Sequence, residues 1–359
     1  MRYLFASAVF VALVSALPAH ALDEAEAKAV MARAVDGYIA PAYANFHDKA
    51  GDLAEAMAAL CDTPSNETFA GVEQSFGNAV EAWSRVDFIR EGPVLEKNRF
   101  ERVLFYPDRK STGMKQVQAL LARPDEAATD PKNLAGKSVA MQGLGALEFV
   151  LFGTGAEEVT KEKGSFRCRY GLAVARNVEA IGGELEAAWT APDGVALHWK
   201  EPSRDNPVFR DGEEAVRALI GIHVHGLEAV RDQRIRAFYQ GKDGKLAPKA
   251  AVFWRSGNTI RAISANVAGL EELWKTADMG RLLPEDIRSV ASSVTFDYKA
   301  ASRALASLSQ PTAEALADEK YRGKLDFADL TLKDAIARIN DDVGGAIGLG
   351  AGFSFADGD

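Results

Sequence analysis

The sequence predicts an all-α protein, and two observations support this prediction. Apolar residues recur at intervals of three and four over most of the chain, as they do on the buried face of a helix. Runs that alternate with a period of two and are rich in Val, Ile and Thr, which are typical of strands, are nearly absent. The chain has 359 residues, of which 47% are hydrophobic and 26% charged, so its composition is that of an ordinary globular protein.

The helical pattern is interrupted at recognisable places. Pro41 lies inside the first periodic stretch and is expected to break or kink that helix. Helices are expected, in chain order, over residues 23–60, 68–90, 114–122, 134–152, 169–189, 213–239, 259–274, 284–308 and 332–343.

The longest break in the pattern divides the chain into two parts. Residues 190–211 contain three prolines and no helical periodicity, so they predict a linker. We therefore expect two helical bundles, one over residues 22–191 and one over residues 211–359. The segments 145–150 and 225–230 both contain Leu-Glu-x-Val, which suggests that the bundles are a pseudo-duplicated pair.

The N-terminus predicts export. Residues 1–21 combine Arg2, an apolar run and the small-residue pair of Ala19 and Ala21, which is the pattern of a signal peptide cleaved after Ala21. Leu22, not a cysteine, stands directly after the cleavage site, so a bacterial lipoprotein anchor is not indicated, and no later apolar run is long enough for a transmembrane span. The expected location is the periplasm or cell envelope of a bacterium.

The net charge and the cysteines bear on the class of partner and on the redox state of the chain. The balance of 42 Lys+Arg against 51 Asp+Glu gives a net charge of −9, which makes nucleic acid an unfavourable partner. Cys61 and Cys168 are the two cysteines, and in an oxidising compartment they predict a disulfide. The alternative is a pair of buried free thiols.

Glu148 is the most unusual candidate for a functional site. It stands within a strongly apolar stretch, where an unpaired carboxylate would be costly to bury. It should therefore meet a cation, a cluster of donors, or an arginine, for which Arg90, Arg99 and Arg102 are the candidates. A structural Glu–Arg pair between helices is the alternative to a ligand site.

Other residues offer weaker signals. Gly143 and Gly145 reduce helix propensity, which a close helix contact or an approaching ligand would explain. His225 and Glu228 are three residues apart, so on a helix they share a face and could bind one cation; a local hydrogen-bonded pair is the alternative. Motifs for a serine nucleophile, a His-Glu-x-x-His zinc site, a phosphate loop and a dinucleotide site are all absent from the sequence.

Several blocks together resemble one family. The segment from Gln142 to Gly153 is similar to the Gly-x-His-x-x-Glu signature of the imelysin-like proteins of the bacterial cell envelope, a family also described as insulin-cleaving or iron-regulated. The resemblance extends over essentially the whole mature chain. Further matching blocks are Trp83, residues 88–93, Arg102, residues 105–108, residues 168–170, residues 227–235 and the Gly-Phe…Asp-Gly-Asp ending at 352–359.

The resemblance implies a fold of two helical bundles with a site near their junction. Glu148 and Gly143 are the residues that match the signature. The other residues expected at this site are Gly145, Arg90, Arg102 and Asp108 from the first bundle and Arg255 and Ser256 from the second. Gly145 stands where the signature has His, so a peptidase or metal site built on that His is not supported in this chain.

The resemblance also implies a role in envelope iron or metal physiology. We expect a non-enzymatic protein that binds a metal ion, a metal-containing ligand or another envelope component. Oxygen ligands would suit iron or another divalent or trivalent cation, with Glu148, His225 and Glu228 as candidate ligands. The alternatives are a metallopeptidase-like hydrolase and an envelope scaffold without a ligand.

Overall fold

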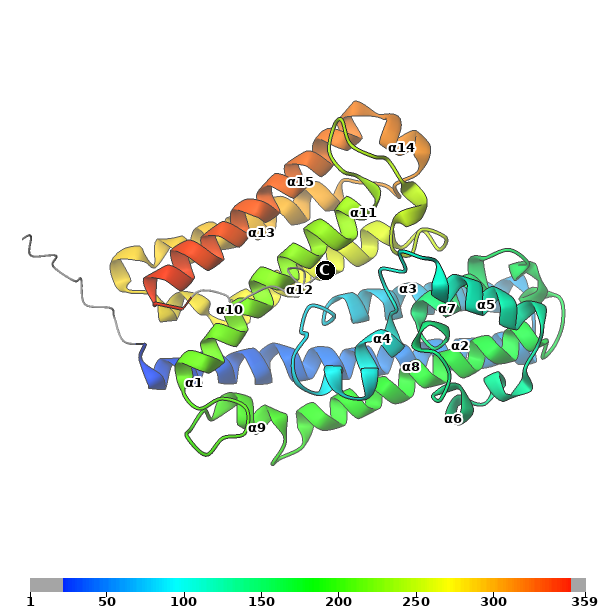
Figure 1. Ribbon diagram of the computed structural model, residues 1–359, viewed down its shortest axis with the longest axis horizontal. Coiled ribbons are helices and arrows are strands. Elements are labelled where there is room, and N and C mark those ends of the chain that lie inside the picture. The colour runs from blue at the N-terminus through cyan, green and yellow to red at the C-terminus, as the bar shows by residue number, and fades with distance from the viewer. Residues whose placement is uncertain (1–21, 350–359) are drawn as a thin grey trace, which may run out of the picture.

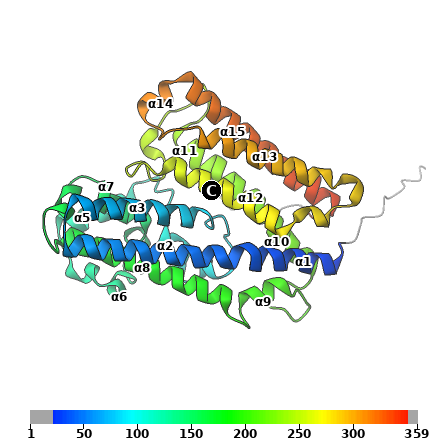
Figure 2. The same ribbon diagram turned by 180° about the vertical axis from the view of Figure 1, so that it is seen from behind.

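The computed structural model describes residues 22–349, which form an all-α protein, as the sequence predicts (Figures 1 and 2). The structure is 74% helical. Between residues 22 and 349 no strand occurs, and the only β-type pairing is an isolated antiparallel bridge between Tyr239 and Leu246. The predicted signal peptide over 1–21 and the tail motif over 352–359 lie outside the described residues.

The helices follow one another with short connections. The part of the chain before residue 211 contains α1 (Glu24–Ala34), α2 (Ala40–Asp62), α3 (Asn66–Ser84), α4 (Arg99–Val103), α5 (Thr112–Ala122), α6 (Pro131–Leu134), α7 (Leu144–Phe152), α8 (Phe166–Thr190) and α9 (Val195–Lys200). The part after it contains α10 (Gly212–Glu228), α11 (Arg236–Phe238), α12 (Thr259–Ala277), α13 (Ser289–Ala306), α14 (Ala313–Ala317) and α15 (Glu319–Ala337). Helices α1, α10 and α15 are each extended by a π-helical turn, over Val35–Ile39, Ala229–Ile235 and Arg338–Gly344.

Two groups of helices pack side by side (Figure 1). In one group α2 packs against α3 and α8, and α7 packs against α8; in the other, α10, α12, α13 and α15 pack together. The groups meet where α3 contacts α12 and where α1 contacts α10 and α12. The division of the chain into two domains at 190–211, and their pseudo-duplication, stay predictions. That segment is also not wholly irregular, because it carries the short helix α9.

Pro41 interrupts the first helix without ending it. The π-helical turn over Val35–Ile39 lies directly before it and joins α1 to α2, so that the two continue as one long helix across the junction (Figure 1). Proline has no N–H for the carbonyl of Gly37, and a turn with wider hydrogen bonding accommodates that loss.

Two of the expected helices begin far from their expected first residue, and the helix expected over 68–90 ends at Ser84. The helix expected over 134–152 begins only at Leu144, because the side chain of Gln142 hydrogen-bonds to the carbonyls of Ala135 and Lys137 and holds the preceding chain in a turn. The helix expected over 332–343 begins at Glu319. The part of this helix before residue 332 exposes large apolar side chains, Phe327 at 51% and Leu330 at 55%, so the sequence there does not show a single apolar face.

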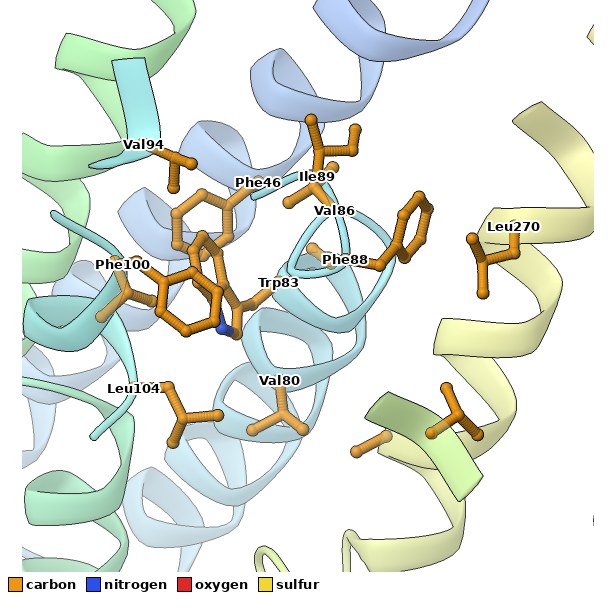
Figure 3. Packing of buried hydrophobic residues seen from close by; sticks show 14 of the residues in the cluster. Phe46, Val80, Trp83, Val86, Phe88, Ile89, Val94, Phe100, Leu104 and Leu270 are labelled. Carbon is orange, nitrogen blue, oxygen red and sulfur yellow. The ribbon is translucent and has the colours of Figure 1, made fainter. Parts of the chain in front are cut away.

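The buried apolar residues form a continuous core that extends through both groups of helices. Trp83 of α3 is fully buried in this core, and its ring centroid lies 5.0 Å from that of Phe46 of α2 and 5.7 Å from that of Phe100 of α4 (Figure 3). Phe88, just beyond α3, lies on the side of this cluster that faces Leu270 of α12 (Figure 3). The core therefore ties the two groups together beneath the junction.

A disulfide joins Cys61 at the end of α2 to Cys168 near the start of α8, with the Cα atoms 5.5 Å apart. The predicted pairing is thus present, and it closes a sequence separation of 107 residues. Within the described part of the chain, none of the helices combines the length and the apolar character that crossing a membrane requires.

Candidate functional site

Helix α7 carries Glu148, and its start depends on a glycine. Gly143 precedes the helix and lies against the backbone at the end of α4: a Cβ atom there would be 2.3 Å from the carbonyl oxygen of Val103. Only glycine permits that approach. Gly145 differs, because a Cβ atom would have Leu104 as its nearest neighbour at 3.9 Å.

A buried polar network holds the start of α7. Arg102 donates from Nε to Gln142 Oε1 and from Nη2 to Asn177 Oδ1, both at 2.8 Å. Asn177 in turn donates to the main-chain carbonyl of Gln142 at 3.0 Å. Arg102 therefore positions the turn before α7 instead of contacting the carboxylate of Glu148.

The other end of α7 is held by Arg167, which is buried at the start of α8. Its guanidinium donates to the carbonyls of Val150 at 2.9 Å, Phe149 at 3.2 Å and Thr154 at 2.9 Å. The carbonyls of Phe149 and Val150 belong to the last turn of α7, and that of Thr154 lies just beyond the helix. A positive charge is favourable at a helix C-terminus. With both ends fixed, the position of Glu148 is fixed as well.

Glu148 is buried, with 4% of the residue exposed, and all its donors act on one oxygen. Oε1 accepts hydrogen bonds from the main-chain N–H of Arg255, the main-chain N–H of Ser256 and the Ser256 hydroxyl, each at 3.0 Å. Among the described residues, no donor reaches Oε2. Burial raises the pKa of the Glu148 carboxyl above its ordinary range, and the hydrogen bonds from Ser256 and the charge of Arg255 oppose that shift.

These donors come from the turn that precedes α12, so Glu148 links the two groups of helices. The turn is closed by a hydrogen bond from the Asn258 N–H to the carbonyl of Phe253, and Phe253 itself has a positive φ of 53°. The backbone strain at a non-glycine residue brings two successive N–H groups toward one acceptor.

The arginines expected beside Glu148 have other partners. Arg99 donates to Glu184 at 2.7 Å and to the carbonyl of Pro93 at 2.8 Å. Arg90 lies over the ring of Phe100, 4.6 Å from its centroid. In the part of the chain that the structure describes, Glu148 forms no ion pair with either arginine or with Arg102. The donors to the Glu148 carboxylate are thus two main-chain N–H groups and the Ser256 hydroxyl, where an arginine side chain was expected.

A cavity of about 540 Å³ opens beside Glu148 at the junction. Gly143, Gly145 and Glu148 line one side of it, and Arg255 lies among the residues of the second group that line it. Asp108 also lines it, but both its oxygens accept hydrogen bonds from the N-terminus of α5, from the N–H of Thr112 at 2.7 Å and of Met114 at 3.1 Å.

Asp232, the remaining carboxylate of this cavity, is paired. It lies 3.3 Å from Arg231 and 3.2 Å from Arg236 in ion pairs. Of the three cavity carboxylates, Asp108 and Asp232 therefore have protein partners, whereas Glu148 has an oxygen without a donor among the described residues.

His225 and Glu228 lie elsewhere, in a smaller cavity of about 30 Å³ that Arg90 also lines. Their side chains interact with each other, His225 Nδ1 being 3.0 Å from Glu228 Oε2. Over residues 22–349 there is no group of three or more His, Cys, Asp or Glu side chains that could hold a metal ion. The three candidate metal ligands of the sequence are thus divided between two cavities.

Comparison with known proteins identifies the family. The sequence matches the imelysin family model, peptidase M75, over residues 39–339. The chain belongs to the imelysin family. No curated protein matches it.

Two solved structures share the fold of this imelysin. An imelysin-like protein from Psychrobacter arcticum aligns with a TM-score of 0.76 and 17% identity, over 93% of this chain and 99% of that one. An iron-regulated protein A precursor from Parabacteroides distasonis aligns with a TM-score of 0.74 and 14% identity, over 92% of this chain and 97% of that one. At sequence identities this low, the structural similarity shows a shared fold and no more.

A second buried charge at the junction was missed by sequence reasoning. Asp87 accepts from Arg234 Nη2 at 2.7 Å and from Asn266 Nδ2 at 2.6 Å. The guanidinium of Arg234 lies over the ring of Tyr106, 4.7 Å from its centroid. Asp87 stands between Val86 and Phe88, so the same cost of burying a carboxylate that drew attention to Glu148 would have indicated it.

Proposed function

We propose that this imelysin is an exported, non-enzymatic binding protein of the bacterial cell envelope, linked to the uptake or homeostasis of iron or another metal. Its ligand would occupy the cavity at the junction. One observation carries the proposal: a buried carboxylate that lines a cavity uses only one of its oxygens for protein donors. The volume of about 540 Å³ is within the range of small-molecule sites.

The envelope and the link to iron have separate support. The predicted signal peptide and the Cys61–Cys168 disulfide are typical of a protein that passes into an oxidising compartment. The neighbour from Parabacteroides distasonis is named as iron-regulated. A carboxylate oxygen is a ligand that iron and other hard cations accept.

Binding is favoured over hydrolysis by the residues that line the cavity. A catalytic zinc site takes three protein ligands, and the described residues contain no group of three metal-binding side chains. The residues that line this cavity also include no histidine or cysteine to serve as base or nucleophile.

The test is the metal content of the protein taken from its native compartment. The wild type, purified from a periplasmic extract, is expected to carry a metal in near-stoichiometric amount, and Glu148→Gln is expected to carry at least ten-fold less by mass spectrometry. Glu55→Gln is the matched control, because Glu55 is exposed on α2 and does not line the cavity.

Two results would overturn the proposal. One is equal metal content in the wild type and Glu148→Gln, or no metal in either protein. The other is metal-dependent proteolysis by the wild type that Glu148→Gln abolishes, which would favour the hydrolase.

A further inference from the structure

Two cationic side chains in the same cavity form no direct ion pair with a carboxylate of the described residues. Lys249 and Arg255 both line it, and neither side chain forms a hydrogen bond or an ion pair with another residue within 22–349. Both instead lie over the ring of Trp254, with Lys249 Nζ 5.6 Å and Arg255 Cζ 4.4 Å from its centroid. Glu148 lies in the same cavity and its charge interacts with that of Arg255 without a hydrogen bond between the two side chains, so the two cations together carry one more charge than this carboxylate balances.

The chain around these cations is fixed before any ligand binds. Tyr106 donates from its hydroxyl to the carbonyl of Ala250 at 3.1 Å, and Thr259 donates from Oγ1 to the carbonyl of Val252 at 2.6 Å. The main-chain N–H of Arg255 is held on Glu148 at 3.0 Å. A site whose backbone is already ordered loses less entropy on binding.

From this arrangement, and resting on the function proposed above, we infer that the ligand is an anionic chelate of a metal cation. The cation lies at Oε2 of Glu148, and the carboxylate or phenolate groups of the chelator lie at Lys249 and Arg255.

The charges of the cavity favour a chelate over either component alone. A bare cation would find a single free carboxylate oxygen and two positive side chains. A bare anion would find the two cations but also the carboxylate of Glu148. A chelate supplies the remaining metal ligands itself, and it presents opposite charges to Glu148 on one side and to Lys249 and Arg255 on the other.

The experiment is calorimetric titration of the purified, metal-free mature protein with three probes: ferric citrate, citrate alone, and ferrous ion without chelator under anaerobic conditions. Ferric citrate is expected to bind at least ten-fold more tightly than the other two. Lys249→Gln and Arg255→Gln should each weaken its binding by roughly ten- to a hundred-fold, the usual effect of losing one charge-assisted hydrogen bond. Lys242→Gln is the control, since Lys242 is exposed and lies outside the cavity.

The outcomes separate this inference from the function on which it rests. If ferric citrate binds to the wild type and not to Glu148→Gln, but Lys249→Gln and Arg255→Gln bind it normally, the binding function stands and the chelate inference is wrong. Ferrous ion or citrate alone binding as tightly as ferric citrate would also contradict the inference. Absence of binding by all three probes would overturn both. Circular dichroism of each variant shows whether it is folded.

Discussion

Two carboxylates are equally buried near the junction, and their surroundings are different. Asp87 and Glu148 each expose 4% of their surface. Asp87 has a donor on each oxygen, from Arg234 and from Asn266, whereas Glu148 has three donors on Oε1 alone and lines a cavity. Burial of a charge therefore does not distinguish a structural residue from a binding residue. We propose that the number of carboxylate oxygens that have protein donors distinguishes them.

The comparison predicts opposite roles for the two groups. The Asp87–Arg234 pair joins the end of the α3 region to the π-helical turn after α10, so it fixes one group of helices to the other. Removing one member of such a pair leaves an uncompensated buried charge. Glu148 also joins the two groups, but an oxygen atom remains for a ligand.

The largest expected effect is that of Arg234→Met. Methionine has a similar volume but leaves Asp87 buried without its cation, so unfolding free energy should fall by about 3–5 kcal/mol. The measurement is urea unfolding followed by circular dichroism. Because burial raises the pKa of Asp87, the deficit should shrink as the pH is lowered and Asp87 takes up a proton.

Two further variants show whether the loss comes from the pair. Adding Asp87→Asn to Arg234→Met should recover part of the lost stability, since no charge then remains buried. Arg204→Met, at an exposed arginine, should change the unfolding free energy by no more than about 0.5 kcal/mol. A double variant less stable than Arg234→Met would contradict the structural role assigned to Asp87.

An intermediate effect is expected from the two glycines at the start of α7. In Gly143→Ala the new methyl group would lie 2.3 Å from the carbonyl of Val103, so the backbone must shift, at a cost of about 1–3 kcal/mol. Gly145→Ala has room and a better helix former, so it should gain up to about 1 kcal/mol. Thermal unfolding of the two variants measures the difference, and equal stabilities would show that the close approach at Gly143 is not required.

The fold was largely predictable, and the exceptions have physical causes. Period-3.6 patterning predicted the all-α class and most long helices, because an amphipathic helix shows its buried face in the sequence. It failed for residues 134–143, where buried polar contacts of Gln142 hold a turn, and for the part of α15 before residue 332, where Phe327 and Leu330 are exposed. Both depend on tertiary contacts that periodicity does not report.

The site was predictable only in part, for a similar reason. Glu148 could be found because a carboxylate in an apolar helix is costly and needs partners. Those partners are mainly the main-chain N–H groups of residues 255 and 256. Every residue except proline has such a group, so the sequence does not indicate which of them will contact Glu148. The unpaired state of Lys249 and Arg255 is likewise a property of the folded chain.

The smallest expected effect is on stability in Glu148→Gln, and its pH dependence has a definite sign. Glu148 has a folded-state pKa raised above its ordinary value of 4.5, because it is buried. Below that value the carboxyl is protonated in both states. As the pH rises above it, the unfolded chain ionises first, so the wild type loses stability until the folded-state pKa is passed.

Glutamine retains an acceptor for Arg255 and Ser256 and cannot ionise, so Glu148→Gln should lack this loss. At pH 7 it should be as stable as the wild type or more stable, by about 1 kcal/mol, while Asp87→Asn should be less stable because Arg234 is left without its anion. Unfolding free energies of the three proteins between pH 4 and pH 8 test this. If Glu148→Gln proved as destabilising as Asp87→Asn, Glu148 would be a structural carboxylate like Asp87. A carboxylate with donors on only one oxygen would then not mark a binding site.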